Sequence, residues 1–349
     1  MSKHVLSQQG RRRRGLALVG AVVAAGLALT GCGSSSDGSS TATNLNLVGF
    51  SILEQPNKTV FADFAKASEG KGVTFKGSYG ASGDQSRAVA AGQNADVVHF
   101  SLETDITRLV DAGLVAKDWN TGPTKGIASQ SVVVIVVRKG NPKGIKTWSD
   151  LVKPGVKIVT PNPGSSGSAR WNILAAWGSV IADGGSEADA KAYLTKFFDN
   201  TVSLPGSGRE ATTAFNSGTG DVLLSYENEA ITARQKGADF DYIVPDTTLL
   251  IENPAAVTTE AKPAAAKFLE FLEGKQGQLD YAKSGFRPLV DVGSFQTPGA
   301  NDPSNPYPAP SKKLLTITDD FGGWAAAAPK FFDEKTGIVT QIQADTGKS

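Results

Sequence analysis

Short apolar segments of strand type alternate with helical patterns along most of the chain, and this alternation limits the possible folds more than any other feature. Strand patterns at 44–50, 73–80 and 95–100 are followed by helical spacing at 58–68, 86–93 and 103–113. Residues 131–138 are almost continuously apolar and β-branched, as expected for a strand buried on both faces. The pattern therefore predicts an α/β fold with largely parallel sheets flanked by helices.

The length of the chain indicates two domains. About 305 residues follow position 44, which is more than one hydrophobic core usually organises. The long strand patterns at 131–138 and 241–251 are candidates for segments that pass between the domains. We expect a middle block, 131–245, to form one lobe and 45–130 with 246–349 to form the other; two sequential domains are the alternative.

The first 31 residues have the form of a secretion signal. The basic start contains Lys3 and the run 11–14 of arginines, and the 16 uncharged residues 15–30 follow it. Sixteen residues are fewer than the roughly 20 needed for a permanent membrane span. The signal ends in LTGC, which resembles the lipobox of bacterial lipoproteins, so we expect cleavage before Cys32 and its lipidation. Residues 32–44 then form a flexible tether, and the folded part is held at the outer face of the membrane.

Charge argues against a nucleic-acid partner. Removal of 1–31 takes away five basic residues and no acidic ones, which leaves 30 Lys and Arg against 34 Asp and Glu, a net charge of −4. No basic excess remains to release counterions from a phosphate backbone. Cys32 is the only cysteine and His99 the only histidine after the signal, so we expect no disulfide, no metal site and no cofactor.

Three glycine- and serine-rich segments each connect a strand pattern to a helical pattern. They are SYGASGDQ at 78–85, GSSGSAR at 164–170 and PGSGRE at 205–210, and helices are predicted at about 168–180, 186–198 and 210–217. The first amides of a helix have no partner within it, and the helix dipole adds partial positive charge there. Glycine admits a ligand close to the backbone, and serine adds a hydroxyl donor. Such helix starts can bind an oxyanion without a lysine, although each segment alone is also an ordinary turn with a serine cap.

TPNPGSSGSARWNILAAWG at 160–178 resembles a motif of the sulfate- and thiosulfate-binding proteins of bacterial ABC importers. GSYGASGDQSRAV, ADVVHFSLETDI, GDVLLSYENEA and ITDDFGGWAAA resemble other segments of that family, so the similarity extends from about 45 to about 345. The resemblance implies a two-lobed, type II periplasmic-binding-protein fold that closes over sulfate, a permease partner, and a monomer without enzymatic activity. It also implies that backbone amides, one serine hydroxyl and one indole hold the anion, with no contacting cation.

Position by position, the resemblance implies these ligand donors: Ser82, Ser166, Gly167, Ser168, Gly208 and Tyr226. The family has glycine in place of Ser168 and alanine in place of Gly208, and both changes keep the backbone donor. Its tryptophan aligns with Tyr226, one residue closer to the third segment, and Leu53 replaces an aspartate. We expect Arg170 and Arg209 to stabilise the anion loops without touching the ligand; plain surface arginines are the alternative.

Hydrogen-bond inventory favours sulfate over phosphate. Near neutral pH sulfate only accepts hydrogen bonds, whereas phosphate carries a proton that needs an acceptor; placing it against a donor costs on the order of 1–3 kcal/mol. Thiosulfate and molybdate are also unprotonated, so they remain alternatives.

The case for catalysis is weak. A surface hydrolase that uses Ser166 or Ser82 is the alternative from another class, but GSSGS lacks the last glycine of a nucleophile elbow. We expect His99 to be structural, and Glu227 and Glu229 to be solvated or to bind neighbouring backbone. We therefore expect no catalytic residue.

Overall fold

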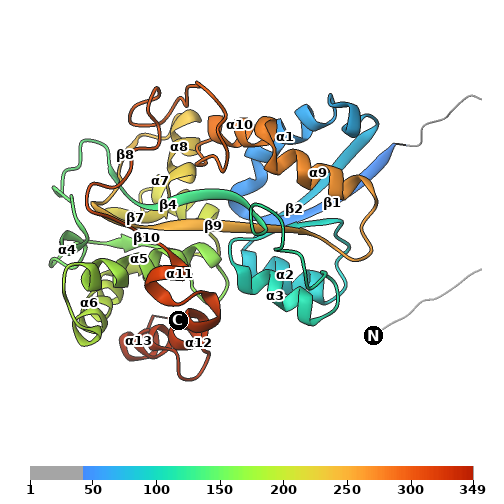
Figure 1. The fold of residues 1–349 in the computed structure, drawn as a ribbon. Coiled ribbons are helices and arrows are strands. Elements are labelled where there is room, and N and C mark those ends of the chain that lie inside the picture. Colours follow the sequence, from blue (N-terminus) through green and yellow to red (C-terminus); the bar gives the residue numbers. More distant parts are fainter. Residues whose placement is uncertain (1–41, 349) are drawn as a thin grey trace, which may run out of the picture. The chain divides into compact units, whose positions relative to one another are not determined.

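The computed structural model describes residues 42–348, and Figure 1 shows how their helices and strands are arranged. The expected signal segment, 1–31, and Cys32 lie outside the described residues. Within 42–348 no helix has both the length and the apolar character needed to cross a membrane.

One half of the fold is a parallel sheet of β1 (Thr43–Phe50), β2 (Val73–Gly80) and β3 (Val97–His99) with helices on both faces. The helices are α1 (Pro56–Phe64), α2 (Ser82–Ala90), α3 (Glu103–Asp111), α9 (Ala264–Glu273) and α10 (Lys275–Lys283). Figure 1 shows α2 and α3 on one face and α1 and α9 on the other. Aromatic packing fixes the second face: Phe61 and Phe75 stack with ring centroids 4.0 Å apart, and Phe268 of α9 packs against both.

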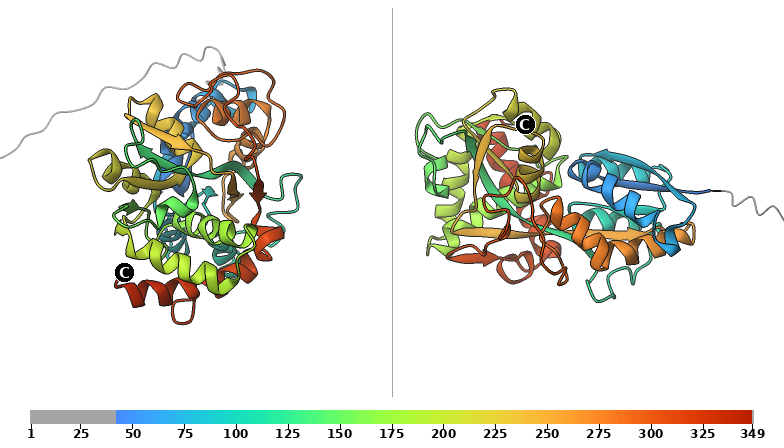
Figure 2. Two further views of the ribbon diagram at one scale, coloured as in Figure 1. Left: turned by 90° about the vertical axis from the view of Figure 1, so that its left-hand side faces the viewer. Right: turned by 90° about the horizontal axis from the view of Figure 1, so that it is seen from above.

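Two long strands connect the halves. β4 (Ile127–Arg138) and β9 (Thr247–Val257) pair antiparallel with each other, and β9 also pairs with β3. Residues 132–137 of β4 are almost inaccessible to solvent, as its continuous apolar sequence predicts. In Figure 2 both strands run from one half of the fold to the other.

The other half contains the strands and helices of the middle of the chain. Its strands are β5 (Ile158–Val159), β6 (Thr201–Ser203), β7 (Val222–Tyr226) and β8 (Phe240–Ile243). Its helices are α4 (Trp148–Leu151), α5 (Gly167–Ala182), α6 (Glu187–Asp199), α7 (Gly208–Asn216) and α8 (Glu227–Gln235). The predicted helices at about 168–180, 186–198 and 210–217 are thus confirmed as α5, α6 and α7.

The sheet is mixed, where the sequence predicted largely parallel pairing. Its strand order is β2-β1-β3-β9-β4-β7-β5-β6, with β8 beside β4 and the short β10 (Lys313–Leu315) beside β9. The prediction was too simple because β4 runs against β7 and β8, and β9 runs against β3 and β4. Parallel pairing is confined to the two ends of the sheet and to β10.

The C-terminal helices α11 (Ile317–Phe321), α12 (Trp324–Phe332) and α13 (Ile338–Thr346) follow β10. The Trp324 ring packs edge-on against Trp171 of α5 at 4.8 Å, and α13 packs against α6. We therefore propose the two-lobe division with the crossing strands as boundary, and with residues after about 311 placed beside the middle block rather than with 45–130.

Candidate functional site

The first turns of α2, α5 and α7 meet at one small pocket. The empty space among its lining atoms, part of it open to solvent, is about 180 Å³. The pocket is lined by Phe50, Ser51, Ile52, Gly80, Ala81, Ser82, Ser101, Ser166, Gly167, Ser168 and Gly208. All five glycine and serine positions expected to donate to a ligand are therefore brought together, and no ionisable side chain is among these lining residues.

Direct contacts join the three glycine–serine segments to one another. The Gly83 amide donates to the Ser165 carbonyl at 3.1 Å, and the Ser165 hydroxyl donates to the Gly206 carbonyl at 2.8 Å. A Cβ atom on Gly83 would lie 3.0 Å from the Ser165 oxygen, so a larger residue would press the first two segments apart. Close packing of backbone, made possible by glycine, thus holds the helix starts around the pocket.

The start of α5 brings several donor groups to the pocket. The Ser166 amide donates to the Asn162 carbonyl at 2.9 Å, so only the Ser166 hydroxyl remains for a ligand, and it lies 2.9 Å from the Ser168 hydroxyl. Gly167 and Ser168 are the first two residues of α5, and their amides have no partner within the helix. This segment therefore offers two amides and two hydroxyls to the pocket.

Glycine is required at the start of α5 and is tightly enclosed at the start of α7. A Cβ atom on Gly167 would lie 2.5 Å from the Ser101 hydroxyl oxygen and 2.9 Å from Leu102 Cγ. A Cβ atom on Gly208 would lie 2.8 Å from the Ser168 hydroxyl oxygen. Backbone amides at both positions can therefore approach a ligand more closely than any larger residue would allow.

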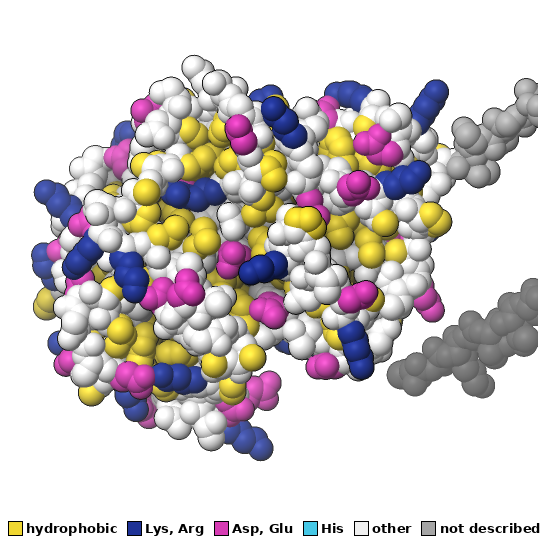
Figure 3. Space-filling model, viewed as in Figure 1, with side chains coloured by type: hydrophobic (Ala, Val, Ile, Leu, Met, Phe, Trp, Pro, Cys, Tyr) yellow, Lys and Arg dark blue, Asp and Glu magenta, His cyan; other side chains and the backbone are white. Residues whose placement is uncertain are grey.

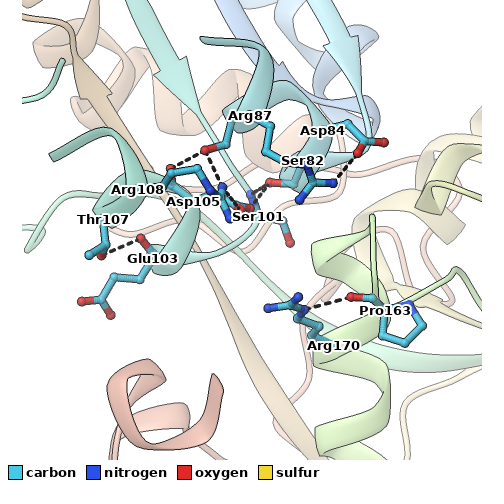
Figure 4. A network of polar contacts seen from close by, with 11 residues as sticks. Ser82, Asp84, Arg87, Ser101, Glu103, Asp105, Thr107, Arg108, Pro163 and Arg170 are labelled. Carbon is cyan, nitrogen blue, oxygen red and sulfur yellow. Dashed lines mark hydrogen bonds and ion pairs between the residues drawn. The ribbon is translucent and has the colours of Figure 1, made fainter. Parts of the chain in front are cut away.

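The Ser82 hydroxyl is already engaged, as Figure 4 shows. It donates to Asp105 Oδ2 at 2.6 Å and accepts from the Ser101 amide at 2.8 Å. Asp105 in turn accepts from Arg108 Nη1 at 3.1 Å. Ser82, the first residue of α2, can therefore serve a ligand only through its backbone amide.

Tyr226 ends β7 immediately before α8 and is fully buried behind the pocket lining. Its hydroxyl lies 2.7 Å from the Ser101 hydroxyl. Burial raises the pKa of the Tyr226 phenol above its usual value, so the side chain is protonated at neutral pH. Tyr226 is thus next to the site, one side chain away from the pocket.

Sequence reasoning missed Ser101, which lines the pocket and holds several parts of the site together. Its carbonyl accepts from the Trp171 indole at 2.9 Å and from the Asn253 amide at 3.1 Å, while its own amide binds Ser82. The available signal was its position directly after the strand pattern 95–100, because residues at the carboxyl ends of strands line ligand sites in α/β sheets.

Arg170 lies outside the pocket and supports the loop before α5. Its Nε donates to the Pro163 carbonyl at 3.0 Å (Figure 4). Its guanidinium lies over the Phe332 ring, 4.9 Å from the centroid. Burial lowers the pKa of Arg170, an effect that the nearby carboxylate of Asp105 opposes and the charge of Arg108 increases.

Arg209 connects α7 to α8 and to the short 3₁₀ helix Ser51–Glu54 that follows β1. Its Nε lies 3.0 Å from Glu229 Oε1, without the alignment of a good hydrogen bond, and its Nη2 approaches the Ile52 carbonyl at 3.3 Å. Neither Arg170 nor Arg209 lines the pocket.

The expectation that Glu227 and Glu229 are solvated or backbone-bound was wrong, because both are buried and each faces an arginine. Arg287 binds Glu227 through two nitrogens at 2.8 and 3.1 Å, and Arg209 faces Glu229. Burial raises the pKa of each carboxyl to about 7, and the facing arginine opposes this rise. The two residues face different partners, in agreement with their separation along the helix.

His99 is a core residue. It is fully buried, its ring packs edge-on against Phe50 at 5.7 Å, and its Nε2 lies 3.1 Å from the Ser129 hydroxyl. Burial lowers its pKa to about 3. The Ser82 hydroxyl is bound to Asp105 and the Ser166 hydroxyl faces Ser168, so neither faces the only histidine among the described residues.

Comparisons with known proteins agree with a ligand-binding role for this pocket. A family described as bacterial extracellular solute-binding protein matches residues 45–287. A sulfate-binding protein of Synechococcus elongatus is 40% identical over 336 residues, which cover 92% of this chain and 94% of the relative. A thiosulfate-binding protein of Pseudomonas aeruginosa is 38% identical over 281 residues, covering 76% and 83%. The relatives are binding proteins, in agreement with the expectation that the chain is not an enzyme.

Solved structures confirm the two-lobed binding-protein fold. The sulfate-binding protein SubI from Mycobacterium tuberculosis H37Rv superposes with a TM-score of 0.77 at 43% identity, covering 83% of this chain and 100% of that chain. The periplasmic molybdate-binding protein of Azotobacter vinelandii superposes with a TM-score of 0.55 at 16% identity, covering 70% and 100%. At that identity the second similarity concerns the fold alone.

Proposed function

The chain belongs to the bacterial extracellular solute-binding proteins, and we propose that it captures sulfate and delivers it to the permease of an ABC importer. The observation that carries the proposal is the small pocket at the starts of α2, α5 and α7, whose lining contains amides and hydroxyls but no ionisable side chain. Its relatives of known name, which bind sulfate or thiosulfate, support the same ligand class.

The donors of the pocket match an anion that only accepts hydrogen bonds. We assign the backbone amides of Ser82, Gly167, Ser168 and Gly208 and the hydroxyl of Ser166 to the ligand. Each helix start carries roughly half an elementary charge, so three together supply about +1.5. Neutral groups can thus balance a dianion in a protein whose expected mature charge is negative.

Arg170 and Arg209 have a supporting role in this proposal. Arg170 fixes the loop before α5 through the Pro163 carbonyl, and Arg209 fixes the start of α7 against Glu229. An arginine in direct contact would hold any anion strongly, including a protonated one. Because both guanidinium groups lie outside the pocket, the assigned backbone amides and the Ser166 hydroxyl determine which anion binds.

Thiosulfate and molybdate are the competing ligands, since both lack a proton and a thiosulfate-binding relative is 38% identical. Phosphate should bind much more weakly, because its proton would face a donor, at a cost of about 1–3 kcal/mol. The Ser101 carbonyl is not free to accept that proton, because it already accepts from Trp171 and Asn253.

We further propose that the protein is exported and held at the outer face of the membrane by lipid on Cys32, as a monomer. The support is the sequence of residues 1–32 and the extracellular family. The two halves joined by β4 and β9 would close over the ligand by bending those strands. On the face drawn in Figure 3, basic and acidic side chains are interspersed, which suits a protein that recognises its ligand inside a pocket.

Thermal unfolding of the purified full chain tests the ligand assignment. A ligand at 100 times its dissociation constant adds about 2.7 kcal/mol to the free energy of unfolding. Sulfate should raise the melting temperature, and phosphate at the same concentration should raise it clearly less. A rise with molybdate or thiosulfate and none with sulfate would transfer the assignment to that anion, and no rise with any of them would refute an oxyanion receptor.

A further inference from the structure

Ser101 and Tyr226 form a pair of hydroxyl groups that runs from the buried core to the pocket. Ser101 lines the pocket, whereas Tyr226 lies behind it, and their oxygens are 2.7 Å apart. We infer that the Ser101 hydroxyl is a further ligand donor and that Tyr226 is the positioning residue that aims its proton at the anion, an inference that rests on the proposed function.

The backbone of Ser101 is fixed on both sides. Its carbonyl accepts from Trp171 at 2.9 Å and from Asn253 at 3.1 Å, and its amide donates to the Ser82 hydroxyl at 2.8 Å. With the amide and the carbonyl occupied, only the side-chain hydroxyl of Ser101 remains for the pocket. These contacts come from β9, α2 and α5, so the position of the hydroxyl is determined by several elements at once.

The hydroxyl faces the start of α5. A Cβ atom on Gly167 would lie 2.5 Å from Ser101 Oγ and 2.6 Å from Ser101 Cβ, so the two residues touch. The Gly167 and Ser168 amides are the donors assigned to the ligand at this point. A ligand held by those amides lies next to Ser101 as well.

The direction of the protons follows from the hydrogen-bond inventory. A serine hydroxyl has one proton and two acceptor sites, and a tyrosine hydroxyl also has one proton. An unprotonated anion can only accept, so Ser101 must donate toward the pocket. The Tyr226 proton then points to Ser101 Oγ, and burial keeps the phenol protonated by raising its pKa. The chain of donation therefore runs from Tyr226 to Ser101 to the anion.

This chain of donation, from Tyr226 to Ser101 to the anion, is called the relay below. It predicts a specific pattern of sulfate affinities, measured by calorimetry on the full chain. Ser101→Ala should weaken binding about ten- to a hundredfold, the usual range for a hydrogen bond to a charged group. Tyr226→Phe should weaken it less, about two- to tenfold, because Ser101 loses its orientation but keeps its proton. Since Tyr226 acts only through Ser101, the double variant should bind like Ser101→Ala alone.

Ser225→Ala is the matched control. Ser225 precedes Tyr226 on β7 and therefore faces the other side of the sheet, and it does not line the pocket. This variant should bind sulfate like the wild type. Melting temperatures of all variants without sulfate separate a loss of folding from a loss of ligand contact.

Three results would overturn the relay. Wild-type affinity in Ser101→Ala would remove Ser101 from the ligand shell. An equal further loss when Tyr226→Phe is added to Ser101→Ala would show that Tyr226 acts independently. Failure of the wild type to bind sulfate would refute the proposed function together with the relay, and this case is recognised from the wild type alone.

Discussion

Replacing Gly167 by proline removes one amide from the pocket while the helix itself can accept the change. Gly167 is the first residue of α5, where proline needs no hydrogen-bond partner and its φ suits the helix. The preceding Ser166 has φ −100° and ψ 121°, an extended conformation that proline favours in the residue before it. The backbone of the helix therefore accepts proline, and two changes remain: the loss of the amide donor and the contact of the added Cβ atom with Ser101.

Gly167→Ala is the matched steric control, because both variants add a Cβ atom 2.5 Å from the Ser101 hydroxyl oxygen and only proline deletes the N–H. Overpacking of this kind costs about 1–3 kcal/mol of folding stability, so Gly167→Ala should lower the melting temperature, and its sulfate affinity is the baseline for the effect of the added Cβ atom. Loss of a hydrogen bond to a charged group adds about 1.5–3 kcal/mol, so Gly167→Pro should bind at least tenfold more weakly than Gly167→Ala.

Calorimetric titration of the full chain with sulfate measures both affinities, and thermal unfolding without sulfate checks that both variants fold. Gly122→Ala adds a Cβ atom where no other atom lies within 4 Å and should leave the affinity unchanged. Equal affinities of Gly167→Pro and Gly167→Ala would refute the role of this amide.

Three further predictions concern Arg170, His99 and the proposed lipid anchor. Arg170→Lys keeps the charge but loses the Nε–H that donates to the Pro163 carbonyl, so it should weaken sulfate binding several-fold in calorimetry. Wild-type affinity would show that this hydrogen bond is unimportant for binding. His99 should stay neutral, its C2 proton showing no titration by NMR between pH 5 and 8, because burial lowers its pKa to about 3. The contribution of the neutral His99 to the free energy of unfolding is then present above pH 6.5 and is lost as the pH falls from 6.5 toward 3. A titration midpoint of the C2 proton near pH 6.5 would contradict the burial of His99. Cys32→Ala should move the protein from the membrane fraction to the medium or periplasm in a fractionation assay, and retention in the membrane would exclude the proposed lipid.

The carboxyls near the site affect stability in the opposite sense to His99. Burial raises the pKa of Glu229 to about 7, so the folded state binds more protons than the unfolded state between about pH 4.5 and 7. The stability that this group contributes is present below the unfolded pKa and is lost as the pH rises through 7. The urea midpoint of the wild type should therefore fall between pH 5 and 7.5, and Glu229→Gln should reduce this fall. An unchanged dependence of the urea midpoint on pH would contradict a buried Glu229 carboxyl with a raised pKa.

Local sequence patterns predicted the helices and the meeting of the three glycine–serine segments well. A helix start rich in serine and glycine can be recognised from a short stretch of sequence alone. α5, α6 and α7 accordingly begin and end within a few residues of their predicted bounds. The mixed pairing of the sheet was not predicted because strand direction depends on partners far apart in the chain, as for β4 with β7 and β9.

Residues that act through long-range contacts were also the ones that sequence reasoning missed. Ser101 gains its position from Trp171 and Asn253, 70 and 152 residues away, which no local pattern reveals. Glu229 is buried and faces Arg209, which lies 20 positions earlier in the chain. Spacing along a helix shows which side chains share a face, but it does not show what packs against that face.

The central claim, that backbone amides at three helix starts hold the anion, can be tested by observing those amides directly. Glycine-selective ¹⁵N labelling of the full chain makes the Gly167 and Gly208 amide protons visible by NMR, with Gly122 as an exposed reference. On addition of sulfate, the Gly167 and Gly208 protons should shift downfield, as expected for donors to an anion, while Gly122 stays in place. Saturating sulfate that leaves Gly167 and Gly208 unmoved would contradict the claim.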